Sequence, residues 1–157
     1  MAPCNIMALF DFLKRRRMPK TIEDAMASQA NDFVQAFRGP GSPVPEEALD
    51  YSEASLGHVD RILDDFHRRG VALPEDLHFL ASAYLFETAR REFGGRYLRG
   101  DDDNTFVLVL GEPDCQIGIM AMAKVAGRAA NGPEDDIPFF YAGIRPALDR
   151  GQDATLI

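Results

Sequence analysis

A long apolar stretch interrupted by two adjacent glycines constrains the fold of this chain more than any other feature. Between residues 75 and 93, hydrophobic side chains recur at the three- and four-residue spacings of a helix, among them Leu77, Leu80 and Tyr84. Further aromatic residues widen this apolar surface beyond a single stripe, so we expect neighbours on more than one side. The pattern predicts a central buried helix near 75–93.

A hairpin is predicted directly after this helix. Gly94 and Gly95 end the helix, because glycine adopts the left-handed conformation that is common at helix C-termini. Residues 96–98 and 105–110 then flank a polar turn, and the second of these segments is the most apolar run of the chain. The hairpin is therefore expected near 96–110.

The flanking segments predict amphipathic helices over residues 21–38, 52–69 and 133–148, whereas 116–119 fits either a third strand or the start of a helix. The predicted fold class is α+β, with several helices packed on a small, mostly antiparallel sheet. A helical bundle without a sheet is the alternative.

The chain has 157 residues, which is the size of one ordinary domain. We predict a basic N-terminal segment over residues 1–20, a single α+β domain over 21–148 and a flexible tail over 149–157. Met7 is an alternative start, so residues 1–6 need not be made in the cell.

Charge is distributed unevenly within a formal net charge of -8. Residues 1–20 hold five of the 17 Lys and Arg and one of the 25 acids, which leaves residues 21–157 with 12 basic and 24 acidic side chains. This excess of acids over residues 21–157 repels the phosphate backbone of a nucleic acid, so no nucleic-acid partner is expected. The same charge favours a basic protein partner.

The cysteine content favours a reducing compartment. Cys4 and Cys115 form neither a C-x-x-C pair nor a metal-binding spacing, and two cysteines are too few for a disulfide framework. A cytoplasmic location is therefore expected. The sequence contains no cofactor motif, and we predict no cofactor.

Residues 7–20 suggest a second kind of contact. Apolar burial combined with electrostatic attraction could hold this segment on an anionic membrane surface. The residues that would make this contact, or a contact with a partner, are Phe10, Phe12, Lys14, Arg15, Arg16 and Arg17. A short helix docked on the domain, or a frayed terminus, is the favoured interpretation.

Three potential metal ligands share one stripe of the helix over 52–69. Asp60, Asp64 and His67 lie at i, i+4 and i+7, and two carboxylates with an imidazole can bind a divalent metal. Acids and histidines also occur on the ordinary polar face of such a helix, and no remote fourth ligand is identifiable. A metal site is therefore not favoured.

Glu87 is the candidate for acid–base chemistry. It lies within the apolar run 81–89, where an unpaired carboxylate is costly to bury. A structural ion pair with Arg91 at i+4 is predicted, with Arg90 at i+3 as a second cation. A general acid or base is the alternative, although the sequence identifies no nucleophile beside it.

Two segments resemble a group of small bacterial domains of unknown function. Those domains carry an S-L-x-x-V-D-x-x-L helix and then Y-L-G-E-x-x-R-x-x-x-G-G-x-W at a helix-to-strand junction. The matching residues here are Ser55, Leu56, Val59, Asp60 and Leu63, followed by Tyr84, Leu85, Glu87, Arg90, Gly94 and Gly95. Phe86 replaces the glycine of the second motif, and Tyr97 replaces its tryptophan. The resemblance implies an α+β fold in a bacterial cytoplasmic protein and brings no known activity.

These observations predict a non-enzymatic interaction or regulatory module that binds a protein partner through an acidic surface. Neutralisation of a toxin is one version of this role. The first alternative is a metal-dependent or acid/base hydrolase that uses Asp60, Asp64 and His67, or Glu87. The second is a peripheral membrane protein that binds through residues 7–20.

Overall fold

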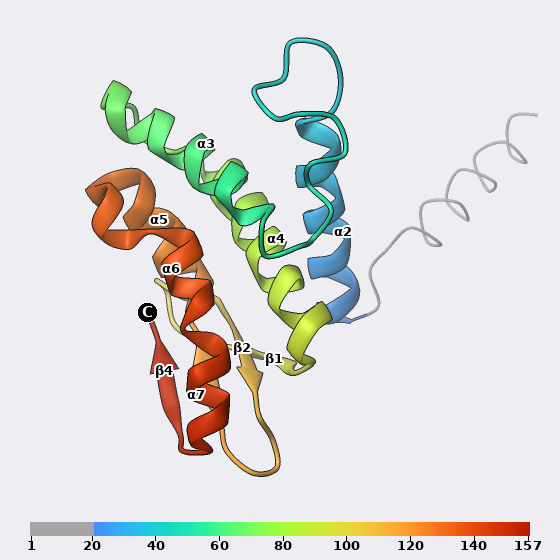
Figure 1. The fold of residues 1–157 in the computed structure, drawn as a ribbon, viewed down its shortest axis with the longest axis vertical. Coiled ribbons are helices and arrows are strands. Elements are labelled where there is room, and N and C mark those ends of the chain that lie inside the picture. The colour runs from blue at the N-terminus through green and yellow to red at the C-terminus, as the bar shows by residue number, and fades with distance from the viewer. Residues whose placement is uncertain (1–20) are drawn as a thin grey trace, which may run out of the picture.

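The computed structural model of the chain describes residues 21–157. Its helices are α2 (Ile22–Ala36), α3 (Leu56–Arg69), α4 (Glu75–Phe93), α5 (Ala121–Asn131), α6 (Ile137–Ala142) and α7 (Ile144–Arg150), with a short 3-10 turn η1 (Pro133–Asp135). Its strands are β1 (Arg96–Arg99), β2 (Phe106–Leu110), β3 (Ile117–Ile119) and β4 (Ala154–Leu156). The predicted α+β fold is confirmed, with helices packed on one small sheet (Figure 1).

Helix α4 is the centre of the core, as its sequence predicts. Every residue from Ala81 to Ala89 is buried, because α2 packs along one side of α4 while α5 and β2 contact it from others. Gly94 ends the helix with a φ of 77°. The same α4 side chains thus join the helical layer to the sheet.

The sheet has the order β1-β2-β3-β4. The predicted hairpin of β1 and β2 is antiparallel and pairs Tyr97 with Leu108. β3 continues the antiparallel order and pairs Ile119 with Leu108, which resolves segment 116–119 as a strand. β4 pairs with β3 in parallel, so the sheet is mixed, with two antiparallel pairings and one parallel pairing.

The C-terminal residues differ from the prediction of a flexible tail over 149–157. α7 continues to Arg150, and the next residues turn back to place β4 beside β3, with Ala154 N donating to Gln116 O at 3.1 Å. Asp153 strengthens this connection, because its Oδ1 accepts from Gln116 N at 2.8 Å. A three-residue strand has too short an alternation to be recognised in a sequence.

The predicted last helix is divided into separate elements. Asp136 ends η1 and begins α6, where its Oδ1 accepts from Phe139 N at 2.7 Å. Gly143 then separates α6 from α7. Pro146 lies within the first turn of α7, where a proline needs no hydrogen-bonded N–H, so it starts the new helix instead of distorting an old one.

Helices α2 and α3 diverge from each other. α2 packs along α4, whereas α3 packs on α5 and α6. In Figure 1 the connection from α2 to α3 loops between these two helices at the upper end of the molecule. A hollow along α3 lies between residues at the end of α2, in α3, in α4 and in the connecting loop.

Candidate protein-binding site

Two of the three candidate metal ligands on α3, Asp60 and Asp64, are bound by an arginine from α5. Arg128 Nε donates to Asp60 Oδ1 at 2.8 Å, and its Nη2 donates to Asp64 Oδ1 at 2.8 Å and to Asp60 Oδ2 at 3.2 Å. Asp60 Oδ1 also accepts from the backbone N of Ile137. Asp60 and Asp64 therefore join α3 to α5 and to the start of α6.

His67 lies against the end of α5 and does not join these carboxylates in a metal site. A Cβ built on Gly132 would stand 2.6 Å from His67 Nε2, so the imidazole packs closely on the Gly132 backbone. Within residues 21–157, no cluster of three or more His, Cys, Asp or Glu side chains could hold a metal ion.

Glu87 forms an ion pair, but with Arg90 and not with the predicted Arg91. Arg90 Nε and Nη2 donate to the two Glu87 carboxylate oxygens at 2.7 and 3.0 Å. The Tyr97 hydroxyl from β1 donates to Oε2 at 2.7 Å. Arg91 instead stacks over the ring of Tyr51, with 3.4 Å from its Cζ to the ring centroid.

The position of β1 explains this choice of arginine. Tyr97 approaches Glu87 on the side of α4 that also carries Arg90. Its ring packs edge-on against the ring of Phe86, with 5.5 Å between the two ring centroids. Both carboxylate oxygens of Glu87 are engaged, and only 1% of the residue is exposed. Such a carboxylate is held as part of the core and is not presented to a substrate.

These contacts set the charge states of the groups involved. The hydrogen bond that Arg128 donates to Asp64 lowers the pKa of Asp64, and the hydrogen bonds that Arg90 donates to Glu87 raise the pKa of Arg90. Burial and the adjacent Glu87 carboxylate raise the pKa of Tyr97, so this hydroxyl stays protonated and acts as a donor. Arg128, Glu87 and Tyr97 thus form structural ion-pair and hydrogen-bond networks.

A different group of carboxylates lines an open hollow between the first turn of α4 and the turn of the β1–β2 hairpin. We call this hollow the acidic groove; its volume is about 680 Å³. Its acids are Glu75, Asp76, Asp102 and Asp103, and it is also lined by His78, Phe79, Thr105 and Met122. Two acids from the start of α4 and two from the hairpin turn, at least 26 positions apart in sequence, therefore place their negative charge in the same hollow.

Hydrogen bonds hold together the three segments that form the walls of the acidic groove: the start of α4, the hairpin turn and the start of α5. His78 Nε2 donates to the backbone oxygen of Met122 at 2.8 Å, which ties α4 to the start of α5. Asn104 Oδ1 accepts from Ala123 N at 3.2 Å, which ties the hairpin turn to the same helix. Asp101 Oδ1 accepts from the backbone of residues 103 and 104 and shapes the turn itself. The groove is thus largely pre-formed.

The acids of the groove have no cationic partner among the described residues. Glu75, Asp76, Asp102 and Asp103 are exposed, and none of them forms an ion pair with any residue of the described range 21–157. Two of them gain some stabilisation from the positive end of α4, whose first turn they occupy. The site therefore has strong negative potential and room for a cation.

This site was not predicted from the sequence. The polar hairpin turn was recognised, but such a turn is common, and nothing in it points to the acids at the start of α4. The signal that could have joined them is the hairpin itself, because a strand leaving the end of α4 carries the turn back along the helix to its beginning.

Comparisons of the chain with family models, curated proteins and solved structures found no match. The resemblance to small bacterial domains therefore stays a prediction. No helix within residues 21–157 is long and apolar enough to cross a membrane. Phe10, Phe12 and the cations from Lys14 to Arg17 lie outside the described residues, so membrane contact through residues 7–20 also stays a prediction.

Proposed function

We propose that this chain is a non-catalytic protein-binding module whose acidic groove binds a basic segment of a partner protein. The observation that carries the proposal is the set of four carboxylates, Glu75, Asp76, Asp102 and Asp103, which converge on one hollow without an ion-pair partner in the described chain. Lysine and arginine side chains are the complementary groups.

The floor of the groove favours Lys or Arg over a small inorganic cation. Phe79 and Met122 supply apolar surface beside the acids. Long basic side chains lay their methylene stems on such a surface while their charged ends reach carboxylates. A basic toxin that this chain neutralises is one partner of this kind, and we place the module in the bacterial cytoplasm.

The ion-pair networks support a binding role over a hydrolytic one. Asp60 and Asp64 are bound by Arg128, and both oxygens of Glu87 are bound by Arg90 and Tyr97. The side chains that a hydrolase would have used therefore stabilise the fold. The four carboxylates of the acidic groove, by contrast, form no ion pair with a described residue.

The proposal is tested by capture of partners on two immobilised variants and the unaltered chain. The groove variant is E75Q/D76N/D102N/D103N. The matched control is D32N/E46Q/E134Q/D149N, which removes the same four charges at exposed sites outside the groove. Bacterial lysate is applied in about 50 mM and about 500 mM salt, and bound proteins are identified by mass spectrometry.

We expect one or more basic proteins to bind the unaltered chain and the control at low salt and to be lost at high salt. The groove variant should recover these proteins in amounts reduced by about tenfold or more, since four charge contacts are removed. Equal recovery on the groove variant and the control would contradict the proposal, and so would the absence of any salt-sensitive partner.

A further inference from the structure

A second hollow lies along α3 and has the opposite character to the acidic groove. Its volume is about 800 Å³, within the range of small-molecule sites. We call it the apolar groove. Its hydrophobic lining is Phe37, Val44, Ile62, Phe66 and Leu77, together with two prolines, Pro43 and Pro45.

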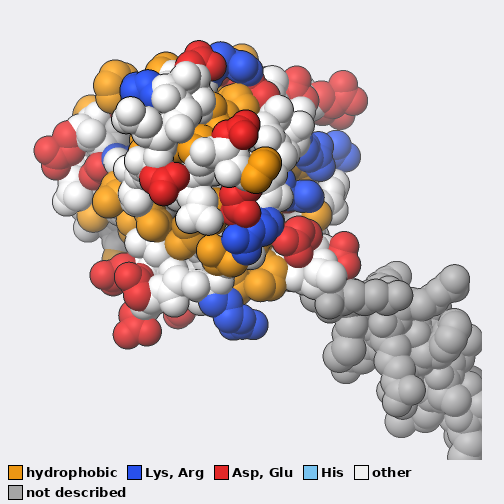
Figure 2. Space-filling view, turned by 90° about the horizontal axis from the view of Figure 1, so that it is seen from below, with side chains coloured by type: hydrophobic (Ala, Val, Ile, Leu, Met, Phe, Trp, Pro, Cys, Tyr) orange, Lys and Arg blue, Asp and Glu red, His pale blue; other side chains and the backbone are white. Residues whose placement is uncertain are grey.

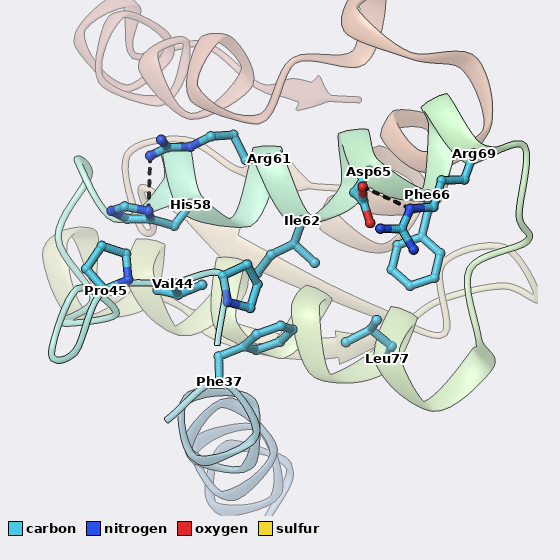
Figure 3. Close-up of a pocket in the computed structure, with 11 residues that line it drawn as sticks. Phe37, Val44, Pro45, His58, Arg61, Ile62, Asp65, Phe66, Arg69 and Leu77 are labelled. Carbon is cyan, nitrogen blue, oxygen red and sulfur yellow. Dashed lines mark hydrogen bonds and ion pairs between the residues drawn. The ribbon is translucent and has the colours of Figure 1, made fainter. Parts of the chain in front are cut away.

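Four segments build the walls of the apolar groove, as Figure 3 shows. Ile62 and Phe66 come from α3, Leu77 from α4, Phe37 from the end of α2, and Val44 from the connecting loop. The groove exists because α2 and α3 diverge, so their apolar residues face each other across a gap instead of packing together.

The loop that forms one wall is fixed in place. Ser42 Oγ donates to the carbonyl of Phe37 at 2.7 Å and accepts from Val44 N at 3.1 Å. Val44 itself is 6% exposed, so its side chain anchors the loop in the core. A ligand would meet a pre-formed wall, which lowers the entropic cost of binding.

The charged groups at the groove are mainly basic, although the body of the protein is acidic. Asp65 is paired with Arg69 at 3.2 Å, which neutralises the acid among the lining residues. Arg61 forms no ion pair with a described residue. Its Nε donates to Gly57 O, and its Nη2 donates to His58 Nδ1 at 3.0 Å.

Arg61 therefore determines how His58 can bind a ligand. Because Nδ1 accepts from Arg61, the neutral imidazole carries its proton on Nε2. Arg61 and His58 lie together at one end of the groove in Figure 3, away from the Asp65–Arg69 pair. This end offers guanidinium and imidazole donors beside an apolar channel.

We propose that the apolar groove binds an amphiphilic monocarboxylate, with its hydrocarbon body on Ile62, Phe66 and Leu77 and its carboxylate at Arg61 and His58. An arginine without an acidic partner is the complement of a carboxylate, and charge-assisted hydrogen bonds are the stronger kind. The negative charge of the protein as a whole disfavours anions, so selectivity for a carboxylate must come from this local pair. This site is independent of the proposed function of the acidic groove.

Calorimetric titration with decanoate and decyltrimethylammonium below their micelle concentrations, and with decanol below its solubility limit, tests the proposal. The three probes share a hydrocarbon chain and differ in head-group charge. We expect decanoate to bind about tenfold or more tightly than decanol, and the cation most weakly. Arg61→Gln should remove the preference for decanoate over decanol, and Arg150→Gln, an exposed charge outside the groove, should preserve it.

The position of the probe is checked by the backbone NMR shifts of the protein with decanoate. We expect the changes to be concentrated at Val44, His58, Ile62 and Leu77. Equal binding of decanol and decanoate by the unaltered chain would overturn the proposal, as would no binding of decanoate or an unchanged preference in Arg61→Gln. Shifts concentrated at the acidic groove would overturn it as well.

Discussion

Carboxylates of the α3–α5 contact and those of the acidic groove serve different purposes, although the residue types are the same. Asp60 and Asp64 each contact Arg128, a residue that is 4% exposed and joins two helices. Asp102 and Asp103 are exposed and form no ion pair with a described residue. The first pair stabilises the fold, whereas the second is available to a partner.

The comparison separates acids that pair with a buried cation from acids that are exposed and form no ion pair with a described residue. Acidic and basic side chains lie close to one another on the face drawn in Figure 2, as on most protein surfaces. Exposed pairs of this kind contribute little to stability. We therefore expect the cost of a substitution to depend on how deeply the cation of the broken pair is buried, as for Arg128 with 5% of its side chain exposed and Arg90 with 30%.

Arg128→Met should have the largest effect. It leaves Asp60 and Asp64 without their buried cation and should lower the free energy of unfolding by about 3–5 kcal/mol. Arg68→Gln is the matched control, because Arg68 contacts the same Asp64 but its side chain is 78% exposed. That control should cost about 0–1 kcal/mol. Urea denaturation measures both, and equal losses would contradict the distinction drawn here.

Glu87→Gln should have an intermediate effect. Arg90 and Tyr97 would lose their charged acceptor, with an expected cost of about 1–3 kcal/mol. Arg90 can turn partly into solvent, since 30% of its side chain is exposed, so the cost should stay below that of Arg128→Met. If Glu87→Gln were more stable than the unaltered chain in urea, Glu87 would be held for function and not for structure.

The sequence could predict α4, the glycines that end it and the hairpin, because these depend on local spacing. Its prediction of Arg91 as the partner of Glu87 was wrong, since Arg90 also lies within reach on a helix and is the residue that pairs. That choice depends on where β1 brings Tyr97, and on the attraction of Arg91 to Tyr51. Long-range placement decides such contacts.

The same limit applies to both grooves. The acidic groove needs the hairpin turn to meet the start of α4, and the apolar groove needs α2 and α3 to diverge. Neither condition can be predicted from the spacing of residues within one element, because both depend on how separate elements are placed. For Asp60 and Asp64, spacing did predict a shared face, but Arg128 lies more than 60 positions away.

Acidification should weaken the α3–α5 contact. The pKa of Asp64 is lowered in the folded state by Arg128, so its contribution to stability is present above the unfolded pKa of about 3.9 and is lost as pH falls through the lower folded value. Arg128→Met should therefore lose less stability than the unaltered chain between neutral pH and about pH 3. Urea midpoints across this range measure the difference, and identical pH dependence of the two proteins would contradict it.

Neutralising the acidic groove should have the smallest effect on stability. The groove variant E75Q/D76N/D102N/D103N should change the free energy of unfolding by no more than about 1 kcal/mol, because its acids are exposed and form no ion pair within residues 21–157. Relief of repulsion among them can offset the lost interaction of Glu75 and Asp76 with the helix dipole. A loss as large as that of Arg128→Met would show that these acids are structural.

The central claim, that the acidic groove is where a basic partner binds, is tested most directly by NMR titration of the protein with a short amphipathic peptide rich in Arg and Leu. We predict that backbone shifts will be concentrated at residues 75–79, 101–105 and 122–123, and that the groove variant will lose them while the D32N/E46Q/E134Q/D149N control retains them. Shifts spread evenly over the exposed acids, such as Asp32 and Asp149, or equal binding by the groove variant, would contradict the account.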